Sequence, residues 1–320
     1  MKQFFLIPAV LTIMSTHSIE ISQQQLEVLQ KNTAAIAQQT NLTDIEPLST
    51  VLKNLKSIEE NTLLKFNTLK QFSTLKPTSA QRNWVTEQLN STQTLQMRNP
   101  DHPNQLIDVI DISQQAASTL KQWTIADKAT TFFDQWMAQN WSWQQFNQHP
   151  DNTDFLALEN ALAQADKLSI DWLFTKLIDE QQLPRSSNRL LFLLFKKLPS
   201  SILAEQLWRN ETDQFSYQTL QTINTIFDTE RAIEQLSYAM NNKHLLSQAL
   251  LLLAKHYPTD EVAHGLLLNK LQQPNSSWLA AAAISGIKQE AFIDKVKNLA
   301  QYSNAPAIQY AHDQLMQGDK

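Results

Sequence analysis

The sequence contains no cysteine and very little glycine. Glycine occurs only as Gly265, Gly286 and Gly318 among 320 residues. The absence of cysteine excludes disulfides, thiolate catalysis and cysteine-ligated zinc. The scarcity of glycine argues against sheet hairpins and against glycine-rich phosphate or dinucleotide loops, because these need positive φ angles or close backbone approach. A helical fold is therefore expected by exclusion.

Positive charge is also scarce. The chain has 26 Lys and Arg against 31 Asp and Glu, a net charge of −5, and no basic run longer than Lys196-Lys197. A nucleic-acid backbone is held chiefly by lysine and arginine contacts. We therefore predict no nucleic-acid partner.

Motifs that carry chemistry are missing as well. None of the seven histidines stands in a His-Glu-x-x-His pattern, and no Gly-x-Ser-x-Gly elbow occurs. The acid pairs Glu59-Glu60, Asp179-Glu180 and Asp260-Glu261 are expected at helix ends or on polar faces, where acids are solvated, and not around a sugar cleft. The sequence predicts no enzyme, with no catalytic residue, no metal and no cofactor.

The first eighteen residues have the pattern of a secretory signal peptide. Lys2 precedes an apolar run at 4–14, and the small residues Thr16 and Ser18 follow it. The run is shorter than the roughly 20 residues that span a bilayer, and no second run of that length follows. We predict cleavage after Ser18, a periplasmic or secreted location and no integral membrane segment in the mature chain. The alternatives are an uncleaved anchor or a buried first helix.

A helical hairpin recurs nearly four times between residues 187 and 299. Equivalent turns fall at Ser200, Thr229, Thr259 and Gln289, at intervals of 29, 30 and 30 residues. Apolar residues stand nine, six and two positions before these turns and three, four and seven positions after them: Leu191, Leu220, Leu250, Ala280, Leu194, Ile223, Leu253, Ala283, Leu198, Phe227, Tyr257, Ile287, Leu203, Ala232, Val262, Phe292, Ala204, Ile233, Ala263, Ile293, Leu207, Leu236, Leu266 and Val296. Such a period is typical of an α-solenoid.

Flanking segments extend this pattern. Residues 154–184, with a turn at Ser169, are interpreted as a degenerate earlier copy, and residues 305–317 as half a unit that caps the end. With Pro199, Pro258 and Pro274 near turns and an alanine-rich segment at 280–283, residues 154–317 resemble the HEAT-like branch of the armadillo-type helical repeat superfamily. The resemblance implies a protein-binding surface and no particular subfamily.

The N-terminal region is predicted to contain long helices. One spans residues 20–38; the next begins at Thr43, whose hydroxyl is expected to cap it in a box with Glu46, and runs without interruption toward Pro77. It carries an apolar seam: Ile45, Leu48, Leu52, Leu55, Thr62, Phe66 and Leu69. The seam predicts a hairpin with residues 20–38 or a coiled coil that forms a homodimer.

More helix is expected on both sides of a loop at 98–104. One helix covers residues 78–97, and another starts at Leu106, pauses near Thr124 and resumes.

An aromatic segment follows, with Trp136, Trp141 and Trp143 over a wide helical arc. One interpretation is a junction core between the N-terminal helices and the solenoid. The other is a ligand or partner surface that stacks on a sugar or peptide.

These patterns predict an all-α protein in which a solenoid of about five helical hairpins follows a long-helix region. The expected domains are a signal peptide at 1–18, an N-terminal helical region at 19–148 and a HEAT-like solenoid at 154–318, divided at residues 149–154. The expected function is that of an exported, non-enzymatic scaffold for a protein of the cell envelope or secretion machinery. The alternative is a peptidoglycan- or glycan-associated protein that uses the tryptophan-rich surface.

Overall fold

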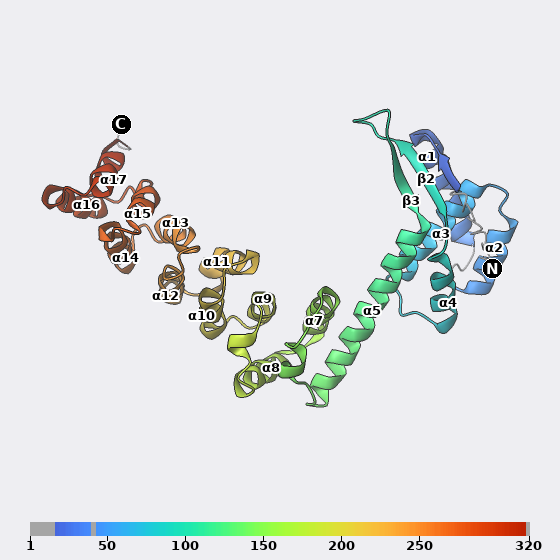
Figure 1. Cartoon of the computed structure of the whole chain (residues 1–320), viewed down its shortest axis with the longest axis horizontal. Coiled ribbons are helices and arrows are strands. Elements are labelled where there is room, and N and C mark those ends of the chain that lie inside the picture. The colour runs from blue at the N-terminus through green and yellow to red at the C-terminus, as the bar shows by residue number, and fades with distance from the viewer. Residues whose placement is uncertain (1–16, 40–42, 318–320) are drawn as a thin grey trace, which may run out of the picture. The chain divides into compact units, whose positions relative to one another are not determined.

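The chain folds into helices arranged in two compact units. The computed structural model describes residues 17–39 and 43–317. The described residues are mostly helical and form seventeen α-helices and three short strands, which supports the predicted all-α class (Figure 1). One unit ends at Lys128 and the other begins at Ala129, so the division falls inside a helix.

The N-terminal unit combines helices with a small sheet. Its elements are β1 His17–Glu20, α1 Gln23–Gln39, α2 Ile45–Asn54, α3 Ile58–Phe72, α4 Ser79–Gln88, β2 Gln93–Arg98, β3 Leu106–Asp111 and the first part of α5 Ile112–Met137. The predicted helix at 20–38 is confirmed as α1.

The strands correct two predicted helices. The helix expected at 78–97 ends at Gln88, and residues 106–111, where helix was predicted to return, are strand β3. The sheet order is β1-β2-β3, with β1 parallel and β3 antiparallel to β2. Six residues, as in 106–111, are too few for periodicity to distinguish a strand from a helix. The predicted loop at 98–104 connects β2 to β3.

The single long helix predicted from Thr43 is wrong. It is two helices, α2 and α3, because Leu55 takes an extended conformation and the Ser57 hydroxyl caps α3 by accepting from the backbone N–H of Glu60 at 3.1 Å. The residue that caps α2 is Asp44 and not Thr43.

The apolar seam of this segment is used within the chain. Leu48 and Leu69 are fully buried, and α1 packs against α3, as the intramolecular hairpin requires. The break between α2 and α3 leaves no continuous seam for a coiled coil with a second copy.

Helix α5 is continuous through Thr124, where a pause was predicted. The Thr124 hydroxyl donates to the carbonyl of Leu120 at 2.9 Å, so its bond stays within the helix. Trp123 is 1% exposed and donates its indole N–H to the carbonyl of Phe72 at 2.8 Å, which fixes α5 to the core of the N-terminal unit.

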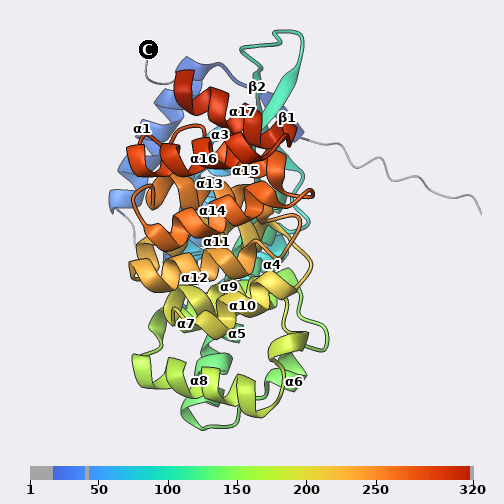
Figure 2. The same ribbon diagram turned by 90° about the vertical axis from the view of Figure 1, so that its left-hand side faces the viewer.

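The C-terminal unit consists of helices. After the last part of α5 come α6 Trp143–Phe146, α7 Asn152–Gln164, α8 Lys167–Asp179, the 3-10 helix η1 Leu183–Arg185, α9 Asn188–Lys197, α10 Ser201–Arg209, α11 Gln214–Ile226, α12 Thr229–Ala239, α13 Leu246–His256, α14 Glu261–Gln272, α15 Ser277–Ile284, α16 Glu290–Tyr302 and α17 Pro306–Gln317. Figure 2 shows these helices one above another.

Two rows of helices run through this unit. Helices α9, α11, α13, α15 and α17, here called the first helices, contact one another in that order. Among the second helices α10, α12, α14 and α16, α12 contacts both α10 and α14. All eight apolar residues predicted nine and six positions before the turns are buried, from Leu191 to Ala283.

The expected register fails in α14. Val262 is 64% exposed, whereas Ala263, His264 and Leu267 are buried. Helix α14 is capped by Asp260, one residue after the expected turn, and this shifts the buried face by one position. The turn predicted at Ser169 is also displaced, because Asp166 caps α8 and accepts from the backbone N–H of Ser169 at 2.8 Å.

The division between the units lies earlier than the predicted boundary at 149–154. The aromatic segment packs with α7 and α8 of the C-terminal unit: the rings of Phe146 and Phe155 are 5.6 Å apart, and Trp143 bonds to the carbonyl of Leu173. These contacts hold the residues on both sides of the predicted boundary in one core.

The predicted signal segment lies largely outside the described residues, which begin at residue 17. His17 and Ser18 belong to β1, where their backbones pair with Gln93 and Thr94. Across the described part of the chain, no helix combines the length and the apolar character that crossing a membrane requires.

Candidate functional site

The structure buries the three tryptophans that were predicted as a ligand or partner surface. Trp136, Trp141 and Trp143 are 3%, 4% and 0% exposed. Trp141 contacts Trp136 and Trp143 edge-to-face, with ring centroids 5.8 and 5.3 Å apart. They form a core, as in the first interpretation, but it is the core of the C-terminal unit. Their burial contradicts the other interpretation, in which these rings form an exposed surface that stacks on a ligand or partner.

Only one of the three indole N–H groups has a partner. Trp143 donates to the carbonyl of Leu173 at 2.8 Å. The indole nitrogens of Trp136 and Trp141 are buried without a hydrogen-bond partner. Because an unsatisfied buried donor costs about 1–3 kcal/mol, this cluster depends on its apolar contacts for stability.

A hollow lies beside the cluster. It has a volume of about 320 Å³ and is lined by Phe132, Gln135, Trp141, Ser142, Gln145, Phe146, Gln148, His149, Pro150 and Asp154. We call it the aromatic pocket. The segment 139–142 that links α5 to α6 forms part of its wall, since Gln139 adopts a positive φ of 53° and turns the chain back after α5.

The glutamine side chains of the aromatic pocket are not engaged in hydrogen bonds with the described part of the chain. Within the described residues, the side-chain amides of Gln135, Gln145 and Gln148 form no hydrogen bond to protein. The lining contains no Lys or Arg, and its single carboxylate, Asp154, accepts from the backbone N–H of Asp151 at 2.9 Å. The pocket therefore offers amide donors and acceptors beside aromatic rings, without a Lys or Arg in its lining.

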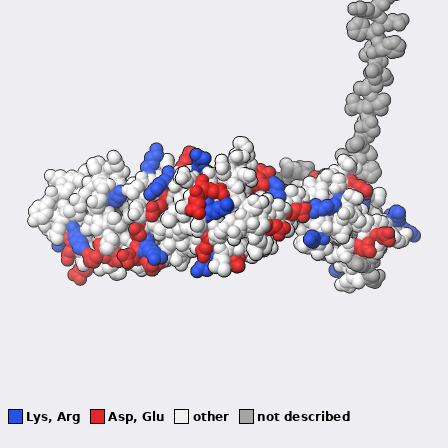
Figure 3. All heavy atoms as spheres, turned by 90° about the horizontal axis from the view of Figure 1, so that it is seen from below, with Lys and Arg blue, Asp and Glu red and all other residues white. Residues whose placement is uncertain are grey.

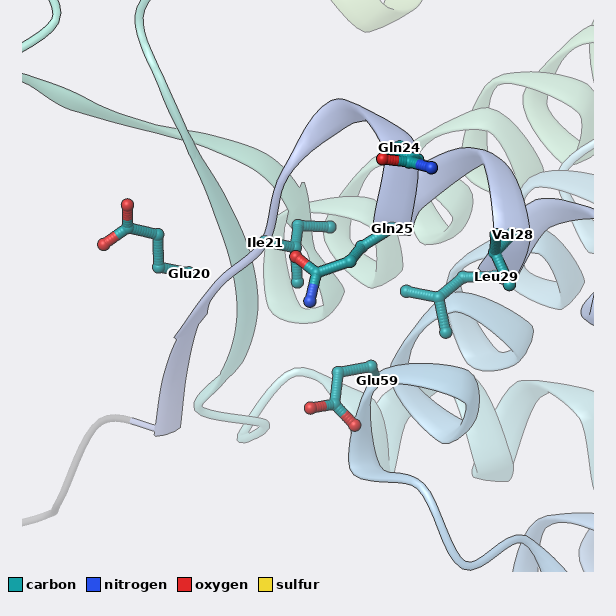
Figure 4. A pocket seen from close by; sticks show the side chains of 7 residues that line it. All are labelled: Glu20, Ile21, Gln24, Gln25, Val28, Leu29 and Glu59. Carbon is teal, nitrogen blue, oxygen red and sulfur yellow. The ribbon is translucent and has the colours of Figure 1, made fainter.

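A second hollow lies on the N-terminal unit at the start of α1. It has a volume of about 400 Å³ and is lined by Glu20, Ile21, Gln24, Gln25, Val28, Leu29 and Glu59. Figure 4 shows Ile21, Gln25 and Leu29 facing Glu59 of α3, with Glu20 at the far edge. Val28 is 53% exposed, so the hollow is open. We call it the α1 pocket.

The two carboxylates of the α1 pocket differ in their surroundings. Glu20 accepts from the Arg98 guanidinium Nε at 2.8 Å. Glu59 accepts from the Ser57 hydroxyl at 2.6 Å, and this hydrogen bond holds the pKa of Glu59 below its ordinary value. The pocket presents an ionised carboxylate above an apolar floor, which suits a cationic side chain on a partner.

A third feature is a set of large exposed side chains on the first helices α11, α13, α15 and α17: Tyr217, Leu251, Trp278, Leu279 and Tyr310. Trp278 is 56% exposed, and its ring lies 5.7 Å from that of Tyr310, so exposed side chains of α15 and α17 meet. We call these five residues the first-helix face.

Charge is distributed unequally between the two rows. Helices α11 and α15 contain no Asp, Glu, Lys or Arg, α13 contains only Lys255 and α17 only Asp313. Each second helix carries both acidic and basic residues. Helix α16, for example, has Glu290, Asp294, Lys295 and Lys297. Figure 3 shows acidic and basic side chains intermixed on the surface seen from below. Between the two rows, the exposed surface with few charges therefore lies along the first helices from α11 onward.

Among the residues weighed for chemistry, His264 and Glu261 form one close pair, with His264 Nδ1 3.9 Å from Glu261 Oε1. Asp260 caps α14, and Glu180 accepts from the backbone N–H of Gln144 at 3.0 Å. His264 is fully buried beside Phe292, with its Nε2 2.8 Å from the carbonyl of Pro258. Among the described residues no three His, Asp or Glu side chains are grouped to hold a metal.

Sequence reasoning missed the most exposed tryptophan. Trp278 belongs to a segment without charged residues, and this lack of charge is the sequence signal that could have indicated a binding surface there. The aromatic segment was predicted as a possible binding surface because it contains many rings, but a high density of rings is also typical of a core.

No protein-family model matches the chain, and neither a curated protein nor a solved structure matches it. The resemblance to HEAT-like repeats therefore stays a prediction from the residues, and function is argued from the chemistry of the surfaces.

Proposed function

We propose that this protein is an exported, non-enzymatic scaffold whose helices α7 to α17 form an α-solenoid. In this proposal the solenoid binds a protein of the cell envelope or secretion machinery. The serial contacts within each row of helices support the solenoid, because each hairpin then buries its apolar stripe against the next. The pattern of residues 1–18 supports export.

The first-helix face carries the proposal. Solvent-exposed helix faces normally bear charges, whereas the centres of protein interfaces are enriched in Tyr, Trp and other large apolar residues and depleted of charge. Trp278 and Tyr310 lie in contact on this face, and α15 has no charged residue. A partner that docks there would bury a surface of low charge.

Site-specific photo-crosslinking tests the proposal. A photoreactive residue at Leu279 is expected to capture one discrete protein in the cell envelope, and Trp278→Ala is expected to abolish that product. The matched control places the same residue at Glu230, which is exposed on second helix α12. Equal products from both positions, or none from Leu279, would contradict a specific docking face.

A further inference from the structure

The aromatic pocket combines two features that small-molecule sites use. Its volume of about 320 Å³ falls within the roughly 300–1,000 Å³ of ligand pockets. Its wall includes the half-buried ring of Phe132 and the uncovered parts of Trp141 and Phe146, which the aromatic cluster supports from behind. The ring centroids of Phe132 and Trp141 are 5.0 Å apart, so this wall is continuous.

The polar groups determine which ligand fits. Three amides, those of Gln135, Gln145 and Gln148, have no hydrogen bond to protein among the described residues and can both donate and accept. No Lys or Arg lines the pocket to hold a phosphate or carboxylate. A sugar ring matches this arrangement, because its C–H face packs on an aromatic ring while its hydroxyls exchange hydrogen bonds with amides.

We propose that the aromatic pocket binds one or two neutral sugar rings of a glycan. The binding residues are Phe132 as the stacking surface and Gln135, Gln145 and Gln148 as hydrogen-bonding groups. This site is distinct from the first-helix face and does not depend on it. In the glycan-associated alternative, the binding site is therefore this pocket and not the buried tryptophans beside it.

Calorimetric titration of the full chain with chitotriose and with cellotriose tests the inference. The two trisaccharides distinguish N-acetylated from unsubstituted rings. At least one is expected to bind saturably in the millimolar range or tighter. The double variant Gln145→Ala/Gln148→Ala is expected to bind about tenfold more weakly, since it removes two hydrogen-bonding amides.

Gln144→Ala is the control, because Gln144 is exposed on α6 beside Gln145 but does not line the pocket. It is expected to leave affinity unchanged. The inference is overturned if neither trisaccharide binds at about 10 mM, well above the millimolar dissociation constants expected. It is equally overturned if the double variant binds like the unaltered chain, or if a neutral acetylated tripeptide binds and the sugars do not.

Discussion

At the scale of single residues, the aromatic cluster shows that helical spacing alone does not reveal where a helix ends. The sequence analysis placed the three tryptophans over a wide arc of one unbroken helix, but α5 ends at Met137 and Gln139 turns the chain with a φ of 53°. Trp141 is folded back onto Trp136 instead, and Trp143 packs on Trp141. A non-glycine residue with positive φ is uncommon, so this turn has no clear signal in the sequence.

The single satisfied indole of the cluster leads to a stability prediction. Trp143→Phe removes the buried hydrogen bond to the carbonyl of Leu173, whereas Trp136→Phe removes an N–H that has no partner. Both variants lose similar apolar volume. Trp143→Phe is therefore expected to lower the free energy of unfolding by about 1–3 kcal/mol more than Trp136→Phe. Urea denaturation measures both, and equal losses would show that the bond contributes nothing.

At the scale of elements, the helices were easier to predict than the strands. Long periodic segments such as 188–197 and 229–239 were recognised, because burial of every third or fourth residue repeats over several turns. Strands β2 and β3 have six residues each, too few for that signal. The scarcity of glycine also argued wrongly against a sheet hairpin. The seven-residue connection at 99–105 reverses the chain without a positive φ, so it needs no glycine.

The cap that separates α3 from α2 gives a prediction that depends on pH. Ser57→Ala removes the N-cap, at a cost of about 0.5–2 kcal/mol, and also the hydrogen bond that holds the pKa of Glu59 low. A depressed folded-state pKa stabilises the fold above the unfolded-state pKa, and this contribution disappears as pH falls through the folded-state value. The loss from Ser57→Ala is therefore expected to be larger at pH 7 than in acid.

Two measurements check this prediction. Chemical denaturation at neutral and acidic pH compares the losses, and an NMR titration should show the pKa of Glu59 rising toward its ordinary value in Ser57→Ala. Ser57→Thr keeps the hydroxyl and serves as the control. An unchanged titration of Glu59 would refute the assigned cause.

At the scale of the whole molecule, the position of the division between units is testable. The sequence favoured residues 149–154 because a Pro-, Asp- and Asn-containing segment is typical of a linker. Sequence composition does not show that Phe146 packs on Phe155 across it. A domain boundary depends on whether residues on the two sides of a turn contact each other. Those contacts are set by the tertiary fold.

Two fragments compare the boundaries. The fragment 129–320 keeps the aromatic cluster with α7 and α8, and is expected to melt cooperatively as an independent unit. The fragment 152–320 lacks Trp136, Trp141, Trp143 and Phe146, and is expected to melt at a lower temperature because Phe155 and Leu173 lose their cover. Circular dichroism on heating measures both. Equal melting temperatures would favour the later boundary.

The uneven exposure of the tryptophans makes the protein its own optical reporter. Six of the eight indoles are buried, Trp172 is half-buried, and Trp278 is 56% exposed. A water-soluble quencher such as acrylamide should therefore reach Trp278 most easily. Any molecule that covers α15 would shield the same indole from the quencher, so occupancy of that surface can be followed in solution without attaching a dye.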